Sequence, residues 1–259
     1  QIMVGEFSLS PSMLPTEIIL RLTSGKTILY PLTIPEGYRI TEIASLLDTQ
    51  GLANSKIFIH QTQDKNLIQA FDIPTDSLEG YLFPETYYLS KLTPEKKIVE
   101  KMVNTFKEKV LKSQILKSIK ESSLSLHEII TLASLIEKET GLDSERKMIS
   151  SVFYNRLKKN MRLQTDPTVI YAIEKFDGNI RKRDLKIDSP YNTYRYKGLP
   201  PGPISSPGLK SIEAAISPIK SNHLYFVSRQ DGSHHFSSNL AEHNRAVKKY
   251  QLRKINSRR

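Results

Sequence analysis

The chain has 259 residues, of which 38% are hydrophobic and 25% charged, and its 38 Lys and Arg against 27 Asp and Glu give a formal net charge of +11. This composition is typical of a globular protein with a sizeable core, built as one large or two smaller domains. The absence of cysteine excludes disulfides and thiolate metal sites. No stretch reaches the roughly 18 apolar residues that span a bilayer. The chain begins at Gln1 rather than Met, so we expect a targeting or anchoring segment to have been removed.

The positive charge favours an anionic partner, such as nucleic acid, anionic lipid or an acidic cell-wall polymer. Part of it lies in the tail KKYQLRKINSRR, residues 248–259. Single-strand binders interleave aromatic residues with their basic stripe, and the sequence has no such stripe. We therefore predict a generally basic surface and no nucleic-acid partner.

The first third of the chain predicts short strands and helices in alternation. We expect a strand at 5–10, an amphipathic helix at 14–25, a strand at 27–34 and helices at 41–47 and 54–63. The run TIPEGYRITEIASLL (33–47) resembles the start of a LysM carbohydrate-binding module, with its strand, Gly-acidic turn and helical Ile-Ala pair. This resemblance predicts a LysM-like subdomain over about 27–63. The alternative is a small packing subdomain without affinity for sugar.

The next segment marks the expected domain boundary. Residues 78–89, LEGYLFPETYYL, form a dense aromatic run interrupted by Gly80 and Pro84. Such clusters stack on sugars or pack at domain junctions. A long helix is predicted from about 93 to 110, followed by a polar connector over 112–123. We expect the boundary near residue 90, which gives domains 1–90 and 91–259.

The most informative stretch is SLHEIITLASLIEKETG, residues 125–141. Ser125 and Glu128 have capping-box spacing, and Gly141 suits a left-handed cap, so a helix is predicted over 126–140. At about 100° per residue its apolar side chains form one wide face, which predicts a mostly buried helix. Glu137 and Glu139 lie at opposite edges of that face. A carboxyl group there would be partly desolvated, and desolvation raises its pKa toward the range that a general acid needs. Periodicity does not choose between the two glutamates, and either could instead be solvated or paired with a cation.

The remainder predicts a mixed α/β region, and the whole chain an α+β protein. Helices are expected over 144–161, after a turn at Asp166-Pro167, over 209–218 and over 239–254, with a strand pair at 223–228 and 232–237. Between them lies SPYNTYRYKGLPPGPISSPG (189–208), rich in proline, glycine and tyrosine. We expect this segment to form an ordered loop that lines a cleft.

The histidines predict no metal site. His127-Glu128 lacks the HExxH spacing of a zinc helix. His234, His235 and His243 lie near one end of the chain and could bind a metal. Local hydrogen bonding of surface or cleft histidines is the simpler interpretation, so we predict neither metal nor cofactor.

Several long motifs occur in an order that resembles the YceG-like family of endolytic murein transglycosylases. They are LASLIEKET (132–140), SVFYNRL (151–157), MRLQTDPTVIYA (161–172), SPYNTY (189–194), GLPPGPISSPG (198–208), YFVS (225–228), the 232–236 segment and EHN (242–244). LEGYLFPETY (78–87) fits the segment before the family's catalytic domain. The resemblance covers nearly the whole chain.

This resemblance implies an enzyme of the cytoplasmic membrane, held by a single N-terminal helix absent from this chain, with its catalytic part facing the periplasm or cell wall. It implies cleavage within peptidoglycan strands at the MurNAc-GlcNAc bond, leaving 1,6-anhydroMurNAc ends, and cell-wall synthesis proteins as further partners. It also implies that the first glutamate of EKET, Glu137, is catalytic, with Glu139 and His234 in supporting roles. The alternative is a non-catalytic peptidoglycan-binding scaffold.

The implied chemistry needs one carboxyl group. A hydrolase uses a second carboxylate as nucleophile or to activate water. A lytic transglycosylase can use the C6 hydroxyl of its own substrate, so one glutamate acts first as acid and then as base. Polar residues of the matched motifs are candidates for binding substrate, or else for structural hydrogen bonds: Asn155, Gln164, Asp166, Tyr191, Asn192 and Tyr194.

Overall fold

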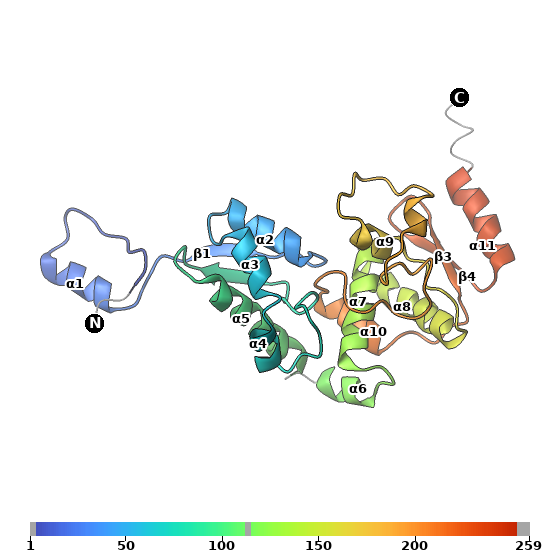
Figure 1. Ribbon diagram of the computed structural model, residues 1–259, viewed down its shortest axis with the longest axis horizontal. Helices are drawn as coiled ribbons and strands as arrows, with labels where there is room; N and C mark the ends of the chain where they lie inside the picture. The colour runs from blue at the N-terminus through green and yellow to red at the C-terminus, as the bar shows by residue number, and fades with distance from the viewer. Residues whose placement is uncertain (1–3, 112–114, 253–259) are drawn as a thin grey trace, which may run out of the picture. The chain divides into compact units, whose positions relative to one another are not determined.

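A computed structural model describes residues 4–111 and 115–252. The chain forms two compact units that divide between Lys107 and Glu108 (Figure 1). Both mix helices with a small sheet, so the predicted α+β class is confirmed. Within the described residues, no helix combines the length and apolar character needed to cross a bilayer.

The N-terminal unit surrounds one antiparallel strand pair. Its elements are α1 (Pro15–Thr23), β1 (Tyr30–Thr33), α2 (Ile40–Thr49), α3 (Ser55–Gln61), α4 (Lys65–Ala70), β2 (Thr86–Leu89) and α5 (Glu95–Phe106). Strand β1 pairs with β2 from Tyr30↔Leu89 to Thr33↔Thr86. Asn54 caps α3 by accepting from two backbone N–H groups, and Phe58 of α3 is fully buried in the core.

The structure differs from the expectations for this half of the chain in four respects. Residues 5–10 form no strand, and helix α4 was not predicted. The domain boundary lies after Lys107 rather than near residue 90, because α5 packs against α3 and buries Ile98, Val99 and Met102 within the N-terminal unit. Part of the expected polar connector is helix α6 (Ile115–Glu121), and residues 112–114 lie outside the described residues.

The C-terminal unit is built on a central helix. Its elements are α6, α7 (Leu126–Glu139), α8 (Asp143–Lys158), α9 (Asp166–Ala172), α10 (Leu209–Ile216), β3 (Tyr225–Ser228), β4 (His234–Ser237), α11 (Leu240–Val247) and a π-helical turn (Lys248–Leu252). Helix α7 packs against α8, α9 and α10. Strands β3 and β4 form a hairpin, with Tyr225 opposite Ser237, that packs against α11.

Helix α7 begins as its sequence predicts. Ser125 accepts a hydrogen bond from the Glu128 backbone, and the Glu128 carboxylate accepts one from the Ser125 N–H at 2.8 Å. Its end differs from the expectation. Gly141 does not take a left-handed conformation; the cap is Thr140 in extended conformation, whose hydroxyl accepts from the Leu142 N–H at 3.0 Å.

The Pro-rich loop 189–208 is ordered; its Tyr194 lines the cavity described below, whereas Pro201, Ile204 and Gly208 contact α7. The Pro201 carbonyl lies 2.8 Å from His127 Nε2, and the Ile204 N–H donates to the Ser134 hydroxyl at 3.0 Å. Every residue of α7 from Ile129 to Ile136 is buried, including the polar residues Thr131 and Ser134. The loop removes this face from water while it satisfies the hydroxyl of Ser134.

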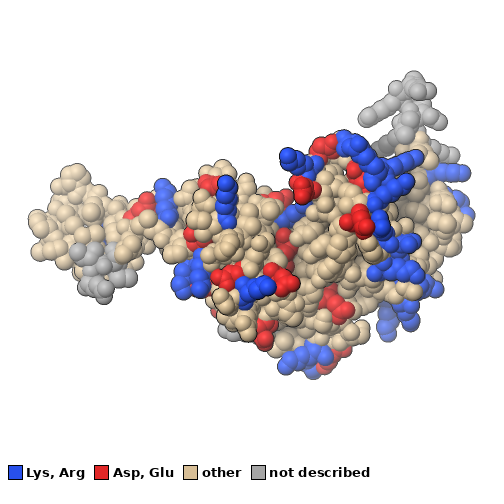
Figure 2. Space-filling view, viewed as in Figure 1, with Lys and Arg blue, Asp and Glu red and all other residues tan. Residues whose placement is uncertain are grey.

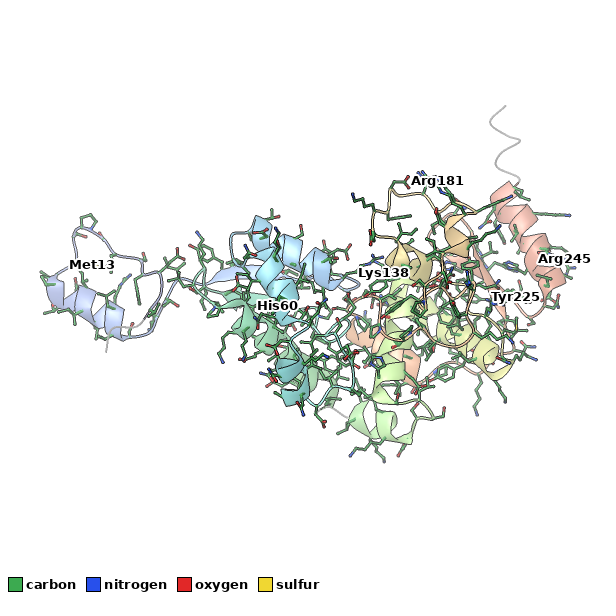
Figure 3. The ribbon with its side chains drawn as sticks, in the orientation of Figure 1. Met13, His60, Lys138, Arg181, Tyr225 and Arg245 are labelled. Carbon is green, nitrogen blue, oxygen red and sulfur yellow. The ribbon has the colours of Figure 1, made fainter. Side chains whose placement is uncertain are left out.

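Positive charge is concentrated in the C-terminal unit. From residue 108 onward the sequence has 28 Lys and Arg against 15 Asp and Glu, whereas the first 107 residues have 10 against 12. Figure 2 shows many cationic side chains over this unit, and Figure 3 labels two of its exposed cations, Arg181 and Arg245. The surface of the C-terminal unit is therefore suited to an anionic partner.

Candidate active site

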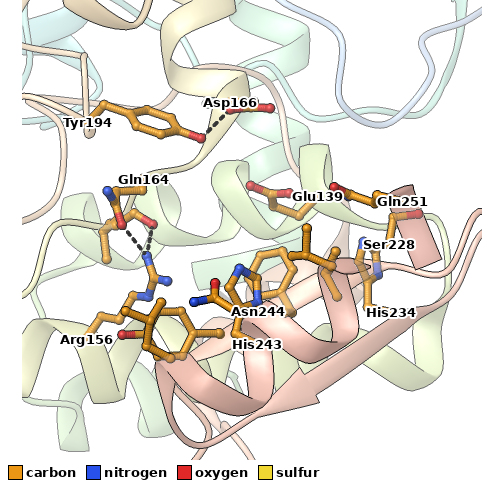
Figure 4. Close-up of a pocket in the computed structure, with 16 residues that line it drawn as sticks. Glu139, Arg156, Gln164, Asp166, Tyr194, Ser228, His234, His243, Asn244 and Gln251 are labelled. Atoms are coloured by element: carbon orange, nitrogen blue, oxygen red, sulfur yellow. Dashed lines mark hydrogen bonds between the residues drawn. The ribbon is translucent and has the colours of Figure 1, made fainter. Parts of the chain in front are cut away.

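The C-terminal unit contains a cavity of about 540 Å³ at the end of α7 (Figure 4). Its volume lies in the usual range of ligand pockets. Side chains from the end of α7, from α8, from the start of α9, from the hairpin and from α11 contribute to its wall. The polar and aromatic ones are Glu139, Arg156, Gln164, Asp166, Tyr194, Tyr225, Phe226, Ser228, His234, His243, Asn244 and Gln251.

Glu139, the last residue of α7, is the partly buried acid of this cavity. Its Oε1 accepts a hydrogen bond from the Thr165 hydroxyl. Burial raises the pKa of Glu139 to about 7; the bond from Thr165 opposes the rise, the charge of Asp166 adds to it and Arg156 opposes it. The Glu139 carboxyl group is therefore protonated in a large fraction of the molecules near neutral pH, as a general acid requires.

Glu137 lies two residues earlier, so its side chain points about 200° away around the helix. Its Oε1 forms an ion pair with Arg146 Nη1 at 2.9 Å, and its Oε2 accepts from the Gly208 N–H at 2.9 Å. The Glu137 side chain is 6% exposed and does not line the cavity. Arg146 also binds Asp143 and the Ser211 hydroxyl. Glu137 therefore joins α7, α8 and the start of α10.

Asp166 and Tyr194 form a second polar pair in the cavity. The Tyr194 hydroxyl donates to Asp166 Oδ1 at 2.5 Å. Burial, reinforced by Asp166, raises the pKa of Tyr194, so the phenol stays protonated. Asp166 is the first residue of α9 rather than part of a turn. Thr165 and Thr193 join the two segments, because the Thr165 N–H donates to the Thr193 hydroxyl at 3.1 Å.

Arg156 forms the cavity wall opposite this pair, and the sequence did not single it out. Its Nε donates to the Leu224 carbonyl and its Nη1 to the Leu163 carbonyl, and the guanidinium lies 5.0 Å from the centre of the Tyr225 ring. Its signal in the sequence was an arginine on the otherwise apolar face of SVFYNRL. Gln164 beside it has φ +52°, a strained conformation of the kind found at functional sites.

Three of the predicted substrate-binding residues do not reach the cavity. Asn155 donates to the Ser221 and His223 carbonyls, both at 2.9 Å. Asn192 is fully buried and donates to the Leu185 and Ile187 carbonyls. Tyr191 packs against Tyr171, with ring centres 4.8 Å apart. Asn155 and Asn192 thus donate to backbone carbonyls of loops. For these two residues the structure shows structural hydrogen bonds, the alternative to substrate binding that the sequence analysis kept.

The histidines occupy different environments. His234 lines the cavity and lies 2.7 Å from Glu145, and His243 stacks on Tyr225 at 5.1 Å between ring centres. Burial lowers the pKa of His243. Within residues 4–111 and 115–252, no group of three or more His, Asp or Glu side chains is arranged to hold a metal ion.

The comparisons with known proteins agree with each other. A family model described as the YceG-like family matches residues 1–249. An "Endolytic murein transglycosylase" of Bacillus subtilis is 40% identical over 95% of this chain and 72% of its own length. A protein of the same name from Streptococcus pneumoniae is 34% identical over 97% of this chain. The chain spans about half, 51%, of that relative's length.

A solved structure has the same fold. The crystal structure of a YceG-like protein from Listeria monocytogenes superposes with a TM-score of 0.77 at 37% sequence identity. The match covers 94% of this chain and 84% of that chain.

Proposed function

Because the chain belongs to the YceG-like family, as its motifs predicted, we propose that it is an endolytic murein transglycosylase that cleaves peptidoglycan strands. The relatives named for this activity match nearly the whole chain. The observation that carries the proposal is a protonatable carboxyl, Glu139, in the wall of a polar cavity large enough for a sugar ring.

In this proposal the general acid is Glu139, in place of the sequence-based assignment to Glu137. Two contrasts support the revision. Glu139 lines the cavity and its pKa is raised to about 7, whereas Glu137 is held away from the cavity by Arg146 and the Gly208 N–H. Both carboxylate oxygens of Glu137 already accept hydrogen bonds from the protein, so Glu137 is not placed to reach a glycosidic oxygen in the cavity.

The reaction then proceeds with one protein carboxyl group. Protonated Glu139 gives its proton to the glycosidic oxygen as the bond from MurNAc C1 breaks. In a mechanism with Glu139 alone, the C6 hydroxyl of the same MurNAc attacks C1 and gives its proton to the Glu139 carboxylate, which closes the 1,6-anhydro ring and restores the acid. No water is consumed, so Asp166 is not needed as a water-activating base. We propose that Asp166, Tyr194 and Gln164 position the sugars instead, with Arg156 holding the wall.

We also propose that the N-terminal unit engages the glycan strand. The order β1, α2, α3, α4, β2 with an antiparallel strand pair supports the LysM-like interpretation, extended to residue 89 by β2 and with α4 as an additional helix. The alternative is a packing unit without affinity for sugar. An enzyme with this substrate acts at the cell wall. Membrane anchoring through a preceding helix is a prediction from the family resemblance.

Digestion of purified sacculi tests the main proposal. The parent protein should release fragments from within strands that end in anhydroMurNAc, lighter by one water than reducing ends and not reducible by borohydride. The Glu139→Gln variant should release none above background. A scaffold protein would bind sacculi equally well before and after this substitution and release no fragments in either form.

A further inference from the structure

A second carboxylate lies behind the cavity wall and binds two polar groups of a single histidine. Glu145 Oε1 accepts from the His234 backbone N–H at 2.8 Å, and Glu145 Oε2 lies 2.7 Å from His234 Nδ1. Glu145 belongs to the first turn of α8, and His234 is the first residue of β4. Their side chains are only 14% and 12% exposed. The mechanism above gives this pair no role.

The pairing determines where the imidazole carries its hydrogen. An ionised carboxylate can only accept, so His234 Nδ1 must donate to Glu145. In the neutral ring, Nε2 then keeps its lone pair and can accept a proton. The edge of the ring packs against Phe226, with ring centres 5.4 Å apart and planes at 87°, which limits its rotation.

His234 presents this ring to the cavity that also contains Glu139 (Figure 4). Glu145 occupies the Nδ1 edge, and within residues 4–111 and 115–252 His234 Nε2 has no hydrogen-bond partner. The cavity therefore contains a proton donor at the end of α7 and an oriented proton acceptor at the start of β4. A donor and an acceptor of this kind can together serve an internal attack by a hydroxyl.

We propose that His234 is the base that takes the proton of the MurNAc C6 hydroxyl, and that Glu145 is the residue that positions it. This inference rests on the proposed function and deepens it. As O6 forms its bond to C1, its proton passes to His234 Nε2. The C1–O4 bond breaks in the same event, and O4 takes the proton of Glu139. Proton exchange with water then returns both residues to their starting states.

Two separate groups remove a constraint of the single-residue mechanism. One carboxyl group must lose its proton completely before it can accept another, whereas a donor and an acceptor can act together. Among the described residues, the charged and titratable groups facing His234 are Glu145 behind the ring and, around the cavity, Glu139, Asp166, Arg156, Tyr194, Tyr225 and His243. Activity then requires His234 neutral and Glu139 protonated, so kcat should pass through a maximum with pH.

The test compares three variants on isolated glycan strands. His234→Gln should lower kcat by about 10²-fold to 10⁴-fold with little change in KM, and should remove the acidic limb of the pH profile. Glu145→Gln should lower kcat as well, because an amide can donate to Nδ1 and thereby favour the wrong tautomer. His235→Gln is the matched control. His235 is the next residue of β4, packs on Tyr250 and does not line the cavity, so its profile should equal the parent's.

Two further measurements separate a catalytic from a structural role. Free imidazole should restore part of the rate to a His234→Gly variant. The ¹⁵N spectrum of the unmodified protein should show His234 protonated at Nδ1 only, above the pH at which the ring becomes neutral. If the His234→Gln variant unfolds, the ¹⁵N spectrum of the unmodified protein is the deciding measurement. A neutral His234 ring protonated at Nδ1 supports the proposal, and one protonated at Nε2 overturns it.

The proposal fails independently of the proposed function. If His234→Gln keeps the parent's kcat and both limbs of the profile, while Glu139→Gln is inactive, then Glu139 acts alone and the enzyme remains a transglycosylase. If the parent protein itself forms no anhydro ends, the proposed function is refuted first.

Discussion

Replacing each glutamate of EKET by glutamine should give opposite results for activity and stability. Glu139→Gln should lower cleavage by about 10²-fold to 10⁴-fold, because it removes the proton donor and keeps the size of the side chain. Glu137→Gln should leave the chemistry of the folded fraction nearly unchanged. It should instead lower the free energy of unfolding, because Arg146 loses its buried partner.

The magnitudes follow from burial and pKa. Glu139 titrates at about 7 when folded against 4.5 as the ordinary value, so folded protein holds more protons between these pH values and stability falls as pH rises through that window. The full difference is about 3 kcal/mol, reached above pH 7. Glu139→Gln should therefore be more stable than the parent at pH 8 by up to about 3 kcal/mol and show no such gain at pH 4.

The Glu137→Gln variant should instead be less stable than the parent. The Arg146 side chain is 6% exposed, and Asp143, another carboxylate that it binds, is 52% exposed. Breaking a buried ion pair by removing one partner typically costs about 3–5 kcal/mol. The amide oxygen can still accept from the Gly208 N–H, so the lower end of that range is expected.

Denaturant unfolding at pH 4 and pH 8, together with digestion of sacculi by both variants, measures these effects. An inactive Glu137→Gln variant as stable as the parent, beside an active Glu139→Gln variant, would refute this reasoning and restore the assignment from sequence.

Four further outcomes are expected. The main products should carry anhydro ends that borohydride does not reduce, and reducible MurNAc ends would contradict this mechanism. Cleavage should continue in EDTA. Asp166→Asn should lower activity less than Glu139→Gln. In a pH series, kcat should decline as pH rises above about 7, because Glu139 loses its proton. A kcat that does not change up to pH 9 would exclude Glu139 as the acid. Asn192→Ala should lower the free energy of unfolding by about 1–3 kcal/mol, because the partly buried carbonyls of Leu185 and Ile187 lose a donor, with KM unchanged in the folded fraction. A chain beginning at Glu108, if its melting curve shows it folded, should still cleave but bind long strands less well than the full chain; equal affinity would leave the N-terminal unit a packing element.

The sequence alone predicted much of the secondary structure and the family. Helix α7 was defined by Ser125, Glu128 and a long apolar face, and these local patterns need no distant partner to be effective. The hairpin β3–β4 and the helices α8 and α10 were likewise expected from periodicity. Local patterns did not predict the boundary after Lys107, because α5 joins the N-terminal unit through contacts with α3, far away in sequence.

The choice between the two glutamates of α7 depended on tertiary structure. Both lie at an edge of the apolar face, so periodicity treats them alike. Arg146, which pairs with the Glu137 carboxylate, lies 9 residues away in the sequence. Gly208, whose N–H donates to the same carboxylate, lies 71 residues away. Thr165, which donates to Glu139, lies 26 residues away, and Glu145 approaches His234 across 89 residues. A carboxyl group takes its pKa from the charges, donors and burial around it, and folding brings these together from distant parts of the chain.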